Sequence, residues 1–115
     1  MSKYRNIETV IDGYKFQSVL ESERYKQLKL LERAKQIKNL RLQVPFVLQE
    51  RFRKNNKSYQ EIKYIADFVY EENGQVIVED TKGIKTEVFR LKQKMFEYKY
   101  PELTLKIVTR EDIWI

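Results

Sequence analysis

The stretch that most constrains the fold is Tyr64–Lys82, which reads YIADFVYEENGQVIVEDTK. Its two arms are rich in branched and aromatic residues, and Asn73-Gly74 between them is a strong signal for a hairpin turn. Each arm carries an acid beside apolar residues, Asp67 within IADFV and Asp80 after VIV. Because side chains alternate along a strand, Asp80 and Lys82 share a face, and the hairpin brings Asp67 within reach of them. The stretch therefore predicts two carboxylates and one ammonium at the end of a strand pair.

These residue types suit a divalent metal ion and the chemistry that it supports. Mg²⁺ prefers hard oxygen ligands and keeps several waters, so Asp67, Asp80 and the backbone carbonyl of Thr81 form a sufficient set. Such an ion can polarise a phosphodiester, while Lys82 can orient the attacking water or neutralise developing charge. Glu21, in a predicted helix, can reach the same metal or a second one. The pattern predicts metal-assisted phosphodiester hydrolysis.

Acid-x-Lys triplets are common in a chain of which 35% of the residues are charged, so context has to select among them. Glu61-x-Lys63 begins a predicted strand, and Glu97-x-Lys99 lies on a predicted helix. Only Asp80-x-Lys82 ends an apolar strand with an acid on the adjoining arm. Neighbouring Glu79 leaves a second register open, because a bulge would place it at the site instead, although the lysine spacing favours Asp80.

Composition restricts the fold and the chemistry further. A chain of 115 residues predicts a single domain over residues 1–115. It contains no cysteine and no histidine, which excludes disulfides, Ser-His and Cys-His catalysis and His-ligated zinc. The net charge of +6 favours an anionic partner such as nucleic acid. No apolar run suggests a membrane segment or a signal peptide, and no small-molecule cofactor motif is present, so we expect a cytoplasmic protein.

The N-terminal half predicts one helix followed by one strand. Residues 1–14 are polar and mixed, which predicts an irregular or partly ordered arm. Apolar residues at helical spacing predict a helix over Phe16–Lys35, capped by Ser18. Short alternating apolar stretches then predict a strand over Ile37–Phe52, in which Pro45 indicates an edge or a bulge. A basic polar turn, RFRKNNKS, is expected to follow, with cations that can contact phosphates.

The C-terminal half predicts a second helix and a last strand. Thr86 can cap a helix that runs to about Lys99, with a buried stripe formed by four apolar residues, Val88, Leu91, Met95 and Phe96. Pro101 ends this helix, and Leu103–Val108 has the pattern of a strand. The order helix, three strands, helix, strand predicts a mixed α/β fold with a central mixed sheet flanked by helices.

The order of these motifs resembles the PD-(D/E)XK nucleases of the restriction-endonuclease-like fold. More closely, FQSVLESERYKQL, LRLQVPF, YIADFVY and VEDTKGIKTEVFRLKQK resemble a family of small phage and prophage proteins. That family is regarded as PD-(D/E)XK-like, near Holliday-junction resolvases and transposon-end nucleases. The resemblance covers roughly Tyr14 to Val108 and implies an αβββαβ core.

The resemblance also implies residue roles. Glu21 becomes the helix acid, Asp67 the first metal ligand, Asp80 the second ligand and Lys82 the motif lysine. Gln43 of LQVP matches a glutamine-bearing strand near the site in related nucleases. The sequence departs from the motif twice, because Ala66 replaces the proline before the first acid, and the motif acid is Asp rather than Glu.

The expected activity is that of a magnesium-dependent DNA endonuclease, with Mn²⁺ as a substitute metal. The resemblance implies branched, Holliday-junction-like DNA as substrate in phage recombination or replication, a homodimer, and the cytoplasm of a bacterial host. Four cations after the motif are candidates for gripping the DNA backbone: Lys85, Arg90, Lys92 and Lys94. Two alternatives stay open, a catalytically silent nucleic-acid-binding or phage assembly protein that retains the fold, and a nuclease acting on DNA ends or nicks.

Overall fold

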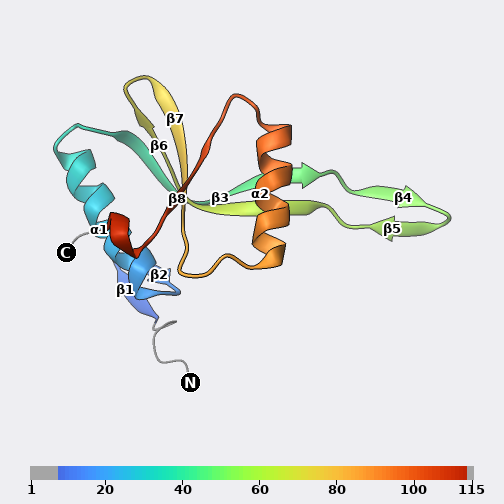
Figure 1. Cartoon of the computed structure of the whole chain (residues 1–115), viewed down its shortest axis with the longest axis horizontal. Coiled ribbons are helices and arrows are strands. Elements are labelled where there is room, and N and C mark those ends of the chain that lie inside the picture. The colour runs from blue at the N-terminus through green and yellow to red at the C-terminus, as the bar shows by residue number, and fades with distance from the viewer. Residues whose placement is uncertain (1–7, 114–115) are drawn as a thin grey trace.

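The computed structural model describes residues 8–113, which form a mixed α/β architecture around a four-stranded sheet (Figure 1). Its elements in chain order are β1 (Thr9–Ile11), β2 (Tyr14–Phe16), α1 (Val19–Arg33), β3 (Lys38–Gln49), β4 (Phe52–Lys54), β5 (Lys57–Tyr59), β6 (Ile62–Glu72), β7 (Gln75–Thr81), α2 (Glu87–Lys99), β8 (Leu105–Val108) and the 3₁₀ turn η1 (Arg110–Asp112). The predicted central mixed sheet with two helices is confirmed.

The central sheet has the strand order β3-β6-β7-β8. β6 is antiparallel to both β3 and β7, whereas β8 is parallel to β7 and reaches it after the crossover through α2. β3 is an edge strand, which explains why its Pro45 is tolerated without a backbone donor. The carboxyl ends of the parallel pair β7 and β8 therefore lie together at one end of the sheet.

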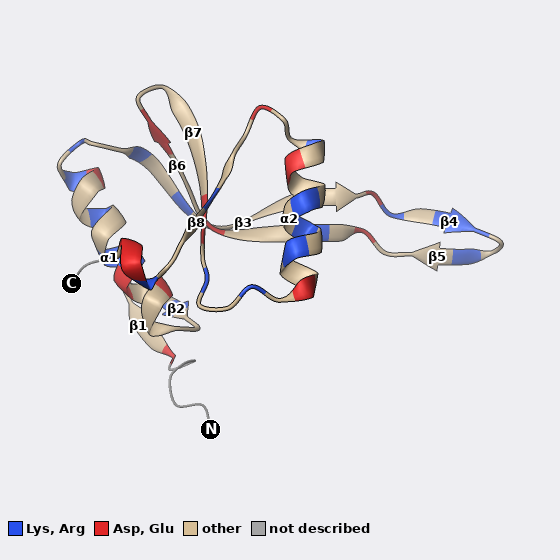
Figure 2. Ribbon diagram, viewed as in Figure 1, with Lys and Arg blue, Asp and Glu red and all other residues tan. Residues whose placement is uncertain are grey.

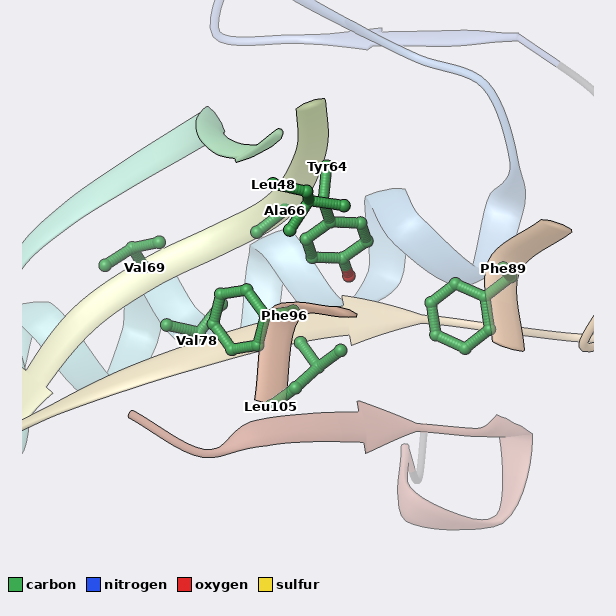
Figure 3. Packing of buried hydrophobic residues seen from close by; sticks show 8 residues of the cluster. All are labelled: Leu48, Tyr64, Ala66, Val69, Val78, Phe89, Phe96 and Leu105. Carbon is green, nitrogen blue, oxygen red and sulfur yellow. The ribbon is translucent and has the colours of Figure 1, made fainter. Parts of the chain in front are cut away.

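The two helices cover opposite faces of this sheet. Val78 packs in a core cluster with Phe89 and Phe96 of α2 (Figure 3). Its neighbour Ile77 packs instead against the cluster that contains Leu28 of α1. Because adjacent strand residues point to opposite faces, each helix covers one face, and burial of both apolar faces stabilises the sheet.

β3 and β6 change faces at matched positions. Leu42 and Phe68 are paired and belong to the cluster under α1, whereas Val44 and Ala66, two positions further along each strand, are paired in the cluster under α2. Residues two apart on a regular strand share a face. Because these do not, the in-and-out alternation of side chains must shift by one residue between Leu42 and Val44 and between Ala66 and Phe68. Gln43, with φ of 54°, supplies the irregular backbone. The reset places Gln43 and Asp67 at the boundary between the two cores.

Three hairpins are closed by two-residue turns with positive φ at both positions, as type I′ turns require. These turns are Asp12-Gly13, Asn55-Asn56 and Asn73-Gly74. The predicted hairpin at Asn73-Gly74 is confirmed. Residues 1–14 were predicted as an irregular or partly ordered arm. Its irregular form is wrong from residue 9 onward, because β1 pairs with β2, while residues 1–7 lie outside the described part. The predicted basic turn is also wrong, since it is the paired hairpin β4–β5.

Both predicted helix caps are confirmed. Ser18 Oγ accepts the Glu21 N–H at 3.1 Å, and Thr86 Oγ1 accepts the Phe89 N–H at 3.1 Å, which satisfies donors that helix starts leave free. The buried stripe of α2 was predicted wrongly in part. Phe96 is buried as predicted, but Val88 and Leu91 are 63% and 59% exposed, because Phe89 faces the sheet instead of them. Neither helix in residues 8–113 is long and apolar enough to cross a membrane.

Candidate functional site

The four residues predicted to carry the chemistry come from three elements that meet beside the carboxyl end of β7. Glu21 lies in the first turn of α1, Asp67 at the face reset of β6, and Asp80 near the end of β7, with Lys82 just beyond it. The β6–β7 hairpin brings Asp67 beside Asp80, and the irregular stretch around Gln43 and Asp67 links them to Glu21 of α1.

Asp67 is held by the end of β7. Its Oδ2 accepts hydrogen bonds from the Thr81 N–H at 2.9 Å and from the Thr81 hydroxyl at 2.8 Å. In return, the Asp67 N–H donates to Asp80 Oδ1 at 3.2 Å. These bonds replace a regular ladder at this point and fix the two carboxyl groups relative to each other. Thr81, predicted as a ligand through its carbonyl, also positions Asp67 through its N–H and hydroxyl.

Glu21 is linked to the same group through Gln43. Gln43 Nε2 donates to Glu21 Oε2 at 2.9 Å and lies 3.5 Å from Asp67 Oδ1, so its amide bridges the helix acid and the strand acid. The second carboxylate oxygen of Glu21 accepts the Gln17 N–H at 3.3 Å. Glu21 therefore has a role beyond the helix cap, because its carboxylate turns toward the sheet.

Asp80 is buried, and its side chain is 2% exposed. Lys82 Nζ lies 2.9 Å from Asp80 Oδ2 and 4.4 Å from the centre of the Phe89 ring, which holds the ammonium between a carboxylate and an aromatic face. Within residues 8–113, Asp80 Oδ2 accepts no hydrogen bond of good geometry despite this ion pair. The Tyr64 hydroxyl, also buried, has no hydrogen-bond partner there either.

The three carboxyl groups perturb one another. Burial raises the pKa of Asp80 to about 7, and the charge of Asp67 contributes to this rise. Burial also raises the pKa of Asp67, with a further contribution from Glu21, and it raises the pKa of Glu21, with a contribution from Asp80. Tyr64 is affected too, because burial and then the charge of Asp80 raise the pKa of its hydroxyl. Among residues 8–113, these three buried or half-buried acids have one lysine ion pair, from Lys82 to Asp80, so the site has a local excess of negative charge.

This donor set fits a divalent cation in its chemistry. All of the donors are oxygens, and the orphaned Asp80 Oδ2 lacks the full set of partners that a buried carboxylate requires. Among residues 8–113, however, no three acidic side chains already surround one point at ligand distances. Gln43 and Lys82 occupy the carboxylate oxygens instead. Binding a metal here requires these two flexible side chains to withdraw.

Glu79, the alternative acid of the motif, lies on the opposite face. Arg24 of α1 binds both of its carboxylate oxygens, with Nε at 2.8 Å from Oε1 and Nη2 at 2.6 Å from Oε2. The Tyr70 hydroxyl donates to the same carboxylate. The regular register of β7 thus directs Asp80 toward Lys82 and Glu79 toward α1.

The cations that follow the motif are arranged less tightly than the acids. Lys85, Arg90 and Lys94 are exposed, and Arg90 and Lys94 are one turn apart on α2. Lys92 lines a groove between β6 and α2 together with Ile65 and Leu91, and the three acids of the candidate site are not among the residues that line it.

Two residues of the site escaped the sequence reasoning. Tyr64 and Phe89 lie beside Asp80 and Lys82, yet the sequence pattern gave neither residue a role: Tyr64 was an ordinary strand residue, and Phe89 lay outside the predicted stripe of the helix. Only the three-dimensional crossing of β6, β7 and α2 identifies them, because no local spacing links either residue to the acids.

Comparison with known proteins identifies a family but no activity. The family model described as "Protein of unknown function (DUF1064)" matches residues 1–113. Comparison with the curated proteins and with the solved structures gave no match.

Proposed function

We propose that this chain, which belongs to the DUF1064 family, is a divalent-metal-dependent DNA endonuclease that hydrolyses phosphodiester bonds. The observation that carries the proposal is the linked group of Glu21, Asp67 and Asp80. Gln43 bridges the first two, the Asp67 N–H binds Asp80, Lys82 is paired with Asp80, and the three pKa values are raised by burial and by one another. Carboxylates in that condition are stabilised by a bound cation. A structural role alone does not require three linked acids with a single paired lysine.

Each residue has a distinct role in the proposal. Asp67 and Asp80 would hold Mg²⁺ or Mn²⁺ directly, and Glu21 would complete the coordination from the helix side after Gln43 withdraws. The bound ion would supply Lewis-acid stabilisation to the scissile phosphodiester. Lys82, freed from Asp80 once the metal compensates that charge, would orient the attacking water or neutralise charge on the phosphate oxygens.

The arrangement of the elements supports a restriction-endonuclease-like αβββαβ core. A helix bearing an acid, α1, precedes the antiparallel strands β3, β6 and β7, and α2 then leads to the parallel strand β8. The hairpins β1–β2 and β4–β5 are additions to that order. Within this proposal the acids lie on the second and third core strands, as the motif order requires.

A second candidate function is nucleic-acid binding without catalysis. It is favoured by the lack, within the described part of the chain, of three acids already placed to hold a metal. In that case Gln43 and Lys82 would be permanent partners of the carboxylates.

The experiment that separates the two uses a labelled four-way junction, a linear duplex, a nicked duplex and a single strand. Each is incubated with Mg²⁺ or Mn²⁺ and then with a chelator. The nuclease proposal expects cutting that the chelator stops and that Asp80→Ala and Lys82→Ala abolish. Preference for the junction would support the branched substrate, and preference for the nicked duplex would support action at nicks. Binding without cutting of any substrate would favour the second candidate.

The proposal includes a homodimer. Exposed apolar side chains lie along the groove between β6 and α2, among them Ile65, Val88 and Leu91. Exposed apolar patches of this kind often mark contacts between proteins. A mass measurement in solution, repeated with Leu91→Glu, tests the state: the wild type should be dimeric and the variant monomeric.

A further inference from the structure

The hairpin β4–β5 has no evident task in the folded core. It forms a two-stranded sheet of its own and extends from the body beyond the ends of β3 and β6 (Figure 1). Its aromatic residues Phe52 and Tyr59 are 42% and 39% exposed. An isolated two-stranded hairpin is only marginally stable in water, so its retention as a projecting ribbon points to a role outside the core.

The hairpin concentrates positive charge (Figure 2). Residues 51–60 read RFRKNNKSYQ and contain four basic residues and no acidic one, although the whole chain has 17 acidic residues for its 23 basic ones. The nearest acids, Glu50 and Glu61, lie at the base and are paired with Lys99 and Lys63, respectively. The tip is therefore purely cationic.

The ribbon is held in shape by contacts of its own. Phe52 and Tyr59 face each other across the strands with ring centres 4.7 Å apart and nearly parallel. Lys57 Nζ lies 5.1 Å from the centre of the Tyr59 ring, and Arg53 Nη1 donates to Ser58 Oγ at 3.0 Å. Aromatic cross-strand pairs and cation–π contacts stabilise strands that lack a core. The cations are thus presented on a preorganised support.

The cations lie on both faces of the ribbon. Lys54 is paired with Lys57, so these two share one face, whereas Arg53 and its partner Ser58 lie on the other. A partner with negative charge on both sides of a groove would meet both faces, unlike a flat anionic surface. With strands about 5 Å apart, a two-stranded ribbon with its side chains fits the major groove of B-DNA, about 12 Å wide, and not the narrower minor groove.

The distance from the tip to the candidate site fits one turn of a duplex. Twelve residues of mostly extended chain separate Asn55 from Asp67. At about 3.3 Å per residue they span at most about 40 Å. One turn of B-DNA is roughly 35 Å long. The ribbon can therefore reach the duplex about one turn away from a phosphate at the candidate site.

From these observations we propose that β4–β5 is a DNA-clamping arm that enters the major groove of double-stranded DNA and binds phosphates about one helical turn from the reaction site. The choice of DNA rests on the proposed function, which the arm would deepen by fixing the duplex against the catalytic end of β7. Double-stranded RNA should be a poor partner for the arm, because its major groove is too deep and narrow.

The test measures binding in chelator, so its outcome does not depend on catalysis. A labelled 30-base-pair duplex is titrated with the full chain, with the arm variant Arg53→Gln/Lys54→Gln/Lys57→Gln, and with a control that loses equal charge near α1, Lys26→Gln/Lys35→Gln/Lys38→Gln. All six of these side chains are exposed. The arm variant loses the Arg53–Ser58 and Lys57–Tyr59 contacts but keeps the Phe52–Tyr59 ring pair, and β4–β5 is a sheet separate from the core. Both variants should therefore keep the melting temperature of the wild-type core, and circular dichroism checks that the arm keeps its strands.

The arm variant should lower the slope of log K against log salt by about 0.9 for each lost phosphate contact. If all three cations touch phosphates, the wild type should lose roughly 40-fold more affinity than the arm variant between 50 and 200 mM salt. The number of base pairs covered per bound chain should fall by about ten in the arm variant. The control variant should change neither the salt slope nor the number of base pairs covered per chain. On duplex RNA, the arm variant and the wild type should have the same salt slope.

Three results would contradict the proposal that β4–β5 is a DNA-clamping arm. If the arm variant and the control variant lost the same DNA affinity, only the net charge of the protein would control binding. If the arm variant bound DNA as the wild type does, DNA would not be the partner of the hairpin. If the arm variant became a monomer but still bound DNA normally per chain, the hairpin would mediate contacts between two copies of the chain instead. Loss of cutting with intact arm-dependent binding would instead refute only the nuclease proposal.

Discussion

Glu79 and Asp80 are neighbours on β7, and both are almost completely buried, yet the structure treats them in opposite ways. Glu79 faces α1, where Arg24 binds both carboxylate oxygens and Tyr70 donates a further hydrogen bond. Asp80 faces the other way, where it shares a small space with Asp67 and has Lys82 as its sole cationic contact among residues 8–113.

The difference separates a structural carboxylate from one that is available for chemistry. A buried ion pair with every lone pair satisfied stabilises only the folded arrangement around it, and removing one partner is costly. The charged form of a buried acid close to other acids is destabilised by repulsion and desolvation, and a bound cation can reduce that destabilisation. Substitutions on the Glu79 side and on the Asp80 side should therefore have different effects.

The largest effect is expected on cleavage when the Asp80 side is removed. Asp80→Asn and Lys82→Gln should each lower the rate of metal-dependent DNA cutting by about 10³-fold or more, because each removes a group that acts on the reacting phosphate. Single-turnover cutting assays measure the effect. Glu102→Gln, on an exposed side chain, is the matched control and should cut at the wild-type rate.

The largest effect on stability is expected from the Glu79 side. Glu79→Gln should lower the free energy of unfolding by about 3–5 kcal/mol, because Arg24 is then left partly buried without its carboxylate. Urea denaturation followed by circular dichroism measures it. A loss below 1 kcal/mol would mean that the pair does not anchor α1 to the sheet.

Replacing Asp80 should change the free energy of unfolding in the opposite direction to replacing Glu79. Asp80→Asn should raise the free energy of unfolding by about 1–3 kcal/mol at pH 8 in chelator, because it removes a charge that burial and Asp67 disfavour. A destabilised Asp80→Asn at that pH would show that the ion pair with Lys82 outweighs the crowding.

The pH dependence follows from the raised pKa of Asp80. The folded protein retains the Asp80 proton up to about pH 7, whereas the ordinary carboxyl pKa is 3.8, so folding takes up a proton between these values. This group therefore makes wild-type stability fall as pH rises from about 4 to about 7, by roughly 1.4 kcal/mol per unit at most, and then level off. Melting curves in chelator across this range measure it, and Asp80→Asn should show a smaller fall.

The smallest effect is expected at Tyr64. Tyr64→Phe removes a buried hydroxyl without a hydrogen-bond partner in the described residues, so unfolding free energy should change by less than about 1 kcal/mol or increase slightly. Denaturation measured beside the wild type checks this. A loss above 2 kcal/mol would indicate that the hydroxyl has a strong partner in the folded protein.

The parts of this fold that were predictable are those set by local chemistry. Asn73-Gly74 fixed its hairpin, and Ser18 and Thr86 fixed two helix starts, because each acts on backbone groups within a few residues. Asp12-Gly13 offered the same kind of signal for β1–β2 and was overlooked.

The parts that escaped prediction depend on packing between distant segments. The paired reset of Gln43 and Asp67, which aims both toward Glu21, has no signature in either strand alone. On α2, helical periodicity could not decide which of two apolar stripes faces the sheet, so Val88 and Leu91 were assigned to the core wrongly. The proximity of the four predicted site residues followed from the hairpin and from the family pattern, whereas Tyr64 required the structure.

The central claim, that the acids beside Lys82 form a divalent cation site, is tested most directly by calorimetric titration with Mn²⁺ in the absence of DNA. Wild type and Glu79→Gln, held at a temperature where the latter is folded, should both bind the ion saturably, and binding should strengthen as pH rises toward 7. Asp80→Asn should show no such binding. Equal binding by Asp80→Asn, or no binding by the wild type, would contradict the account.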